Sequence, residues 1–201
     1  MESIRDDTIV GFNTFLHEQQ DAPGTATITL VQFDSQNPYE EICKFKPIAD
    51  APELDRRAYV PRAATPLYDA VGRGINALDQ QLCRLPDENL PARVVFVIVT
   101  DGKENASYEF RREQIEKMIA EKQEQSDWQF VFLSADLTAI REAESVGFMR
   151  KKSLAFDKNS VGTSRAWGSL SGAVASYRSS RKTQVEFDDL DRNKQESERK
   201  R

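Results

Sequence analysis

The most hydrophobic stretch of the chain is RVVFVIVTD, residues 93–101. It contains six consecutive apolar residues, Val94 to Val99, with no polar residue between them. Because side chains alternate between the two faces of a strand, such a run predicts a strand that is covered on both faces. Strands of this kind are typical of parallel sheets in α/β proteins, so the segment predicts a buried strand of such a sheet.

Helical and strand-like patterns alternate along the chain around this segment. We predict helices at residues 4–20, 66–82, 110–125, 138–146 and 161–177, and strands at 25–33, 39–45, 93–101, 128–133 and 153–156. The strand at 39–45 is charged and suits a sheet edge. The expected fold class is therefore α/β, with a doubly wound, mostly parallel, Rossmann-like sheet and one antiparallel edge strand.

We expect one domain and a tail. The alternating pattern covers residues 1–178. From residue 179 to residue 201 the chain is rich in charged residues and poor in apolar ones. Such a composition cannot bury enough apolar surface to offset the entropy of folding, so we expect this tail to be solvated and disordered.

Length and charge narrow the classes of function. The 201 residues suffice for one domain with its own core, and the net charge is −5. An acidic chain does not suit general nucleic-acid binding, which needs a basic surface. No apolar run approaches the roughly 18–20 residues of a membrane span. The first residues carry acids where a signal peptide has basic ones, so we expect a cytoplasmic protein.

The cysteines and the histidine offer little chemistry. Cys43 and Cys83 lie 40 positions apart with no pairing motif, so we expect two reduced, partly buried thiols. The single histidine, His17, falls on a predicted helix, and we expect it at the surface.

Two polar residues lie where an open parallel sheet binds ligands, beyond the carboxyl ends of its strands. Asp101 ends the central strand, and Thr65 precedes the helix at 66–82. Each also has a simpler interpretation. Asp101 with Gly102 could form only a turn, and Thr65 could serve only as the helix N-cap ahead of Pro66.

Together the two segments resemble a known family. TPLYDAV at 65–71, followed about 30 positions later by VVFVIVTDGKEN at 94–105, is similar to the second and third metal-ligand segments of von Willebrand factor A domains. The helix GFNTFL leading to the strand ITLVQFD adds to the likeness. The resemblance covers about residues 2–178.

The resemblance implies a metal-ion-dependent adhesion site. In that family a divalent cation, usually Mg²⁺, is held by hydroxyl and carboxylate oxygens, and a carboxylate from a protein partner completes the coordination. By this resemblance Thr65 would contribute its hydroxyl, and Asp101 would bind the ion directly or through water. The implied function is protein–protein interaction.

The chain departs from the family pattern at its start. The first family motif, Asp-x-Ser-x-Ser after a central strand, is absent together with that strand, and Ser3, Asp6 and Asp7 fall inside the first predicted helix. Either a longer chain begins upstream or this member has shed the motif. We expect weak Mg²⁺ binding as a result, unless Glu104 or Asp34 helps.

Three functions are compatible with these observations. The first is an interaction module whose partner docks around Thr65 and Asp101. The second is a metal-free scaffolding domain. The third is a metal-dependent phosphatase or nucleotide hydrolase, but the sequence has no P-loop or dinucleotide motif and only one histidine, so we expect no enzyme activity.

Overall fold

The computed structural model describes residues 1–62 and 64–199. This part contains six α-helices and five strands. The helices are α1 (Arg5–Asp21), α2 (Leu67–Leu82), α3 (Arg112–Ser126), α4 (Leu137–Ser145), α5 (Ser160–Arg178) and α6 (Asp189–Arg199). The strands are β1 (Thr27–Gln32), β2 (Glu40–Pro47), β3 (Val95–Thr100), β4 (Gln129–Ser134) and β5 (Ser153–Ala155). Short 3-10 helices lie at Glu2–Ile4, Ile48–Asp50, Asp87–Asn89 and Arg150–Lys152.

The strands of this part form two separate sheets. β1 and β2 make an antiparallel hairpin, and β3, β4 and β5 make a parallel sheet with β4 in the middle. The expected α/β class and the parallel pairing of the buried strands are confirmed. The single continuous sheet that we expected is divided, because among the described strands β1 pairs only with β2 and β3 pairs only with β4.

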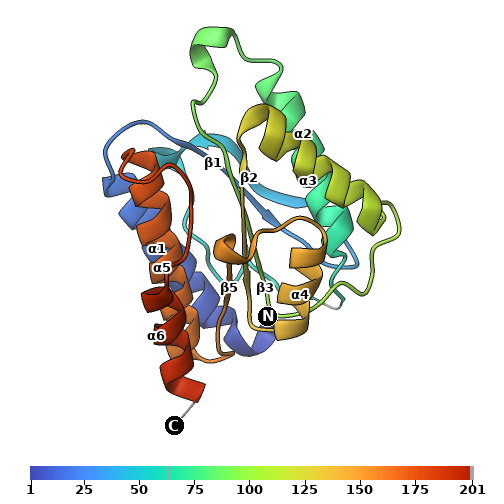
Figure 1. Ribbon diagram of the computed structural model, residues 1–201, viewed down its shortest axis with the longest axis vertical. Coiled ribbons are helices and arrows are strands. Elements are labelled where there is room, and N and C mark those ends of the chain that lie inside the picture. The colour runs from blue at the N-terminus through green and yellow to red at the C-terminus, as the bar shows by residue number, and fades with distance from the viewer. Residues whose placement is uncertain (63, 200–201) are drawn as a thin grey trace.

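Helices cover both faces of the strand layer (Figure 1). On one face, α1 and α5 pack against Val131 and Leu133 of β4. On the other face, α2, α3 and α4 pack against Phe130 and Phe132 of the same strand. All six residues of β4 are buried as a result. Within the part that the structure describes, no helix is both long and apolar enough to cross a membrane.

The C-terminal segment, residues 179–199, differs from the expected disordered tail. Val185 is completely buried and Phe187 is only 4% exposed, and both belong to the core beneath α1 and α5. The Phe187 amide donates to the carbonyl of Lys151, at 2.8 Å. α6 then packs on α5, where Ser169 donates to Asp191 at 2.7 Å. Val185 and Phe187 alone do not predict a buried segment from the sequence, because their burial depends on packing against helices that lie far away in the chain.

Phe187→Ala should therefore destabilise the whole domain. Removing a buried phenylalanine leaves a cavity, and the expected loss is about 3 kcal/mol or more of unfolding free energy. Leu190→Ala, at a side chain that is 69% exposed in the same segment, is the matched control and should change stability by less than about 0.5 kcal/mol. Urea unfolding of both variants measures this. Equal small effects would mean that the segment does not pack on the core.

Candidate functional site

The carboxyl ends of β1 and β3 meet at one cavity of about 220 Å³. Val31 near the end of β1 and Val99 in β3 contribute apolar wall. Thr65, Asp101 and the N-terminal residue Met1 line the same cavity. The two residues singled out from the sequence thus lie at one edge of the strand layer, as the rule for parallel sheets predicts.

Asp101 is paired with two ammonium groups. The α-ammonium of Met1 donates to its Oδ2, and Nζ of Lys158 lies 2.5 Å from the same oxygen. Only 12% of the Asp101 side chain is exposed. Burial by itself would raise the pKa of Asp101, but the hydrogen bonds and charges of Lys158 and Met1 outweigh burial and lower that pKa below its ordinary range. The carboxylate is therefore ionised at neutral pH.

Tyr59 adds a neutral phenol to the cavity wall. Burial raises the pKa of this phenol, and the negative charge of Asp101 raises it further. The hydroxyl therefore stays protonated throughout the physiological pH range. Neither Tyr59 nor Lys158 was singled out from the sequence. Lys158 follows β5, so the rule that carboxyl ends of parallel strands share one edge could have found it.

Thr65 is held by the loop that follows β3. Its amide donates to Oδ1 of Asn105 at 2.7 Å, and the Asn105 amide donates to the Thr65 carbonyl at 3.2 Å. Its hydroxyl lies against Gly102, where an added Cβ would approach Oγ1 to 3.1 Å. Gly102 therefore allows Thr65 to sit beside the end of β3.

The interpretation of Thr65 as the N-cap of α2 is wrong. The helix begins at Leu67, and Pro66 occupies the N-cap position without a side-chain bond. The first backbone amides of α2 donate instead to side chains of the loop that follows β3. The Tyr68 amide donates to Glu104 at 3.0 Å, and the Asp69 amide donates to the Ser107 hydroxyl at 3.1 Å.

A buried carboxylate fixes this loop in place. Asp69 is completely buried and accepts hydrogen bonds from the amides of Tyr108, Glu109 and Phe110, at 3.0, 3.0 and 2.8 Å. Glu104 accepts from two further loop amides and from the Ser107 hydroxyl. The polypeptide from β3 to α3 is thus tied to α2 by side-chain carboxylates, which positions Asp101 and Thr65 relative to each other.

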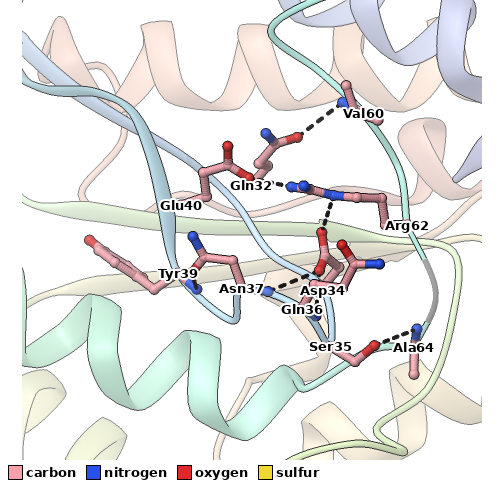
Figure 2. Close-up of polar contacts among 10 residues, drawn as sticks. All are labelled: Gln32, Asp34, Ser35, Gln36, Asn37, Tyr39, Glu40, Val60, Arg62 and Ala64. Carbon is pink, nitrogen blue, oxygen red and sulfur yellow. Dashed lines mark hydrogen bonds and ion pairs between the residues drawn. The ribbon is translucent and has the colours of Figure 1, made fainter.

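A second network ties the Thr65 loop to the end of β1 (Figure 2). Asp34 accepts from Arg62 at 2.7 Å and from the amides of the turn that follows it. Arg62 also donates to Glu40 of β2, and Gln32 accepts from the Val60 amide at 3.1 Å. These contacts hold the cavity wall on the β1 side.

The residues at this edge do not fit a Mg²⁺ site. Mg²⁺ prefers several oxygen ligands in octahedral geometry, and positive groups beside it oppose binding. Of the two acidic residues that line the cavity, Asp101 already pairs with two ammonium groups, and Glu2 has a side chain that is 73% exposed and lies 3.9 Å from Arg5. Asp34 and Glu104, which could have helped, bind Arg62 and loop amides instead. Among the described residues no three or more His, Cys, Asp or Glu side chains are grouped to hold a metal ion.

The remaining candidate residues lie away from this edge. Cys43 is buried and Cys83 is exposed, and both are free thiols. His17 is 55% exposed on α1 and contacts Glu53 at 2.7 Å. The expected free thiols and surface histidine are confirmed, but the expected partial burial is wrong for Cys83, which is exposed.

Comparison with protein-family models, curated proteins and solved structures found no match. The resemblance to von Willebrand factor A domains therefore rests on the sequence motifs at residues 65–71 and 94–105. Family and function are accordingly proposals, which depend on those motifs and on the geometry of this edge.

The ion pairs of Asp101 predict a pH-dependent contribution to stability. A carboxylate whose pKa is lower in the folded state stabilises that state above its unfolded pKa, and the contribution is lost as the pH falls. The unfolding free energy of wild type should therefore exceed that of Asp101→Asn above about pH 5, and the difference should shrink toward pH 2. Denaturant unfolding across this range measures it. Glu88→Gln, at an exposed carboxylate of the short 3-10 helix Asp87–Asn89, is the control; a difference constant with pH would contradict the prediction.

The oxygen atoms available at this edge predict that divalent ions raise the unfolding free energy only slightly. A site with a Kd of about 10 mM or weaker gives less than about 0.4 kcal/mol at 10 mM ion by mass action. Thermal unfolding in EDTA and then in about 10 mM MgCl₂, with NaCl at matched ionic strength as the control, tests this. A larger rise that is specific to Mg²⁺ and disappears in Asp101→Asn would show that the remaining ligands do bind the ion.

Proposed function

We propose that this chain is a protein-interaction module of von Willebrand factor A type, whose partner docks at the carboxyl edge of the strand layer around Thr65 and Asp101. The observation that carries the proposal is that these two residues, which carry the family resemblance, line one cavity. A fixed loop and a partly exposed cavity suit recognition, because a preorganised surface loses little entropy on binding.

The arrangement of the elements supports the family assignment. Strand and helix alternate, helices cover both faces, and the antiparallel strand β2 lies at an edge. We propose that the two sheets correspond to one doubly wound family sheet, divided at the place of the first family strand, which residues 1–62 and 64–199 do not contain. The break between β1 and β3 agrees with that interpretation.

Electrostatics favours a partner that binds without a bridging metal. The family mode uses a cation between two carboxylates, whereas Asp101 here is neutralised by ammonium groups. A basic side chain of a partner would reach the same carboxylate only by displacing one of these two ammonium groups. A metal-free scaffolding domain, the alternative function, would also bind its partner without a metal ion, but through a surface other than this edge. An enzyme is less favoured, because an ion-paired carboxylate is a poor nucleophile or base.

Site-specific photo-cross-linking separates these functions. A photoreactive residue at position 65 should trap a discrete protein in cells, whereas one at Leu90, an exposed residue before the amino end of β3, should not. With the partner purified, Asp101→Asn should weaken binding by about tenfold, the loss expected for a partly buried charge contact. Equal cross-linking at both positions, with unchanged affinity in Asp101→Asn, would move the partner site elsewhere.

A further inference from the structure

The last helix, α6, buries almost no apolar surface. Its sequence, Asp189–Arg199, contains one apolar residue, Leu190, which is 69% exposed. The residue that faces inward is Gln195, a polar residue that is only 3% exposed. An isolated helix of this length is marginal in water, because few hydrogen bonds offset the cost of nucleation. α6 therefore depends on contacts with the rest of the domain, and burial of apolar side chains contributes little to them.

Polar contacts hold α6 against its neighbours. Ser169 of α5 donates to Asp191 at 2.7 Å. The two terminal nitrogens of Arg192 donate to the carbonyls of Ser153 at 3.1 Å and Arg150 at 2.8 Å. Each such bond contributes little net free energy, because the same groups bond to water when the helix is released.

The same segment also buries polar atoms that have no partner. Within residues 1–62 and 64–199, Oε1 of Gln195 and Oε1 of Gln184 are buried and accept no hydrogen bond. Nε2 of Gln195 makes only a long bond, 3.4 Å to the carbonyl of Gly162. A buried atom without a partner disfavours the closed position of α6, since water would bond to that atom in Gln195 once the helix is released. The closed position is therefore favoured by a small margin.

The residues just before α6 form a separate, apolar anchor. Val185 is completely buried and Phe187 is only 4% exposed, and the Phe187 amide donates to the carbonyl of Lys151. Release of this anchor would expose apolar core, whereas release of α6 would not. The exposed residue Asp188 lies between the two parts. α6 can thus open while the anchor stays in place.

α6 lies alongside α5 and runs toward the carboxyl edge of the strand layer (Figure 1). It contacts α5 first at Ser169, and one turn further on Gln195 contacts Gly162. Gly162 lies in the first turn of α5, four positions after Lys158, whose ammonium pairs with Asp101. α6 then continues for four more residues, about 6 Å of helix. The end of α6 therefore flanks the edge at which we place the partner.

We propose that α6 is a latch, which opens from α5 without unfolding the rest of the domain and which, when closed, narrows the approach to the carboxyl edge. The second half of the proposal rests on the proposed function. A partner that covers the whole edge meets the end of the closed helix, so it binds the open state better. Because the closed state is favoured by a small margin, binding of the partner suffices to shift the helix to the open state.

Amide hydrogen exchange measured by NMR on the full chain tests whether α6 opens alone. After correction for intrinsic rates, the α6 amides, among them that of Arg192, should exchange at least about 100-fold faster than those of Phe187 and β4. Gln195→Met removes the unpartnered oxygen and should slow exchange in α6 by about tenfold. Ser169→Ala removes the bond to Asp191 and should speed that exchange by about fivefold.

Gln123→Met is the matched control for this test. Nε2 of Gln123 in α3 also donates to a glycine carbonyl at 3.4 Å, that of Gly147, but its side chain is not among those with an unpartnered buried atom. The control should leave exchange in α6 within about twofold of wild type. Exchange of α6 at the rate of β4 would mean that the helix opens only with the whole domain, and the latch would be wrong. Equal slowing by Gln123→Met and Gln195→Met would also contradict it.

Photo-cross-linking at position 65 tests the effect of the latch on the carboxyl edge. Ser169→Ala should raise the yield of the trapped protein by about twofold or more, and Gln195→Met should lower it, because affinity follows the fraction of open chains. Equal yields in both variants and wild type, with altered exchange in α6, would overturn the regulatory half of the proposal. If no protein is trapped in any of these chains, the proposed function fails together with that half, and exchange in α6 still decides whether the helix is a latch.

Discussion

Backbone amides and carbonyls that leave water need partners, and in the described part of this chain no strand supplies them along one edge of β3. β4 has a strand on each side and is completely buried, whereas β3 has a strand on one side only. The division into two sheets, the partial exposure of the β3 valines and the cavity at the carboxyl ends all agree with this constraint. The helices that cover both faces keep the two parts together.

Side-chain carboxylates, rather than regular secondary structure, build the edge where the cavity opens. Asp69 holds three consecutive loop amides from inside α2, and Glu104 binds the first turn of the same helix. Asn105 then fixes Thr65 through two hydrogen bonds. The bonds that Asp69 and Glu104 accept are charge-assisted and directional, so they hold the loop after β3 against α2.

The electrostatics of Asp101 distinguishes this edge from the metal site that the sequence motifs imply. A cation between carboxylates needs several free oxygens, whereas Asp101 offers one carboxylate that two ammonium groups already neutralise. Lys158 contributes one of these groups from the loop after β5, a third strand end at the same edge.

The sequence by itself determined the five strands, five of the six α-helices, the α/β class and the location of Thr65 and Asp101, because the run Val94–Val99 and the stripe along α2 are local patterns that reflect burial directly; it did not predict α6. It did not determine the two separate sheets, the burial of Phe187 or the pairing of Asp101 with Lys158. These depend on segments far apart in the chain. Strand pairing, cavity filling and ion pairing require a partner at a given position in space, and only the tertiary structure decides which residue arrives there.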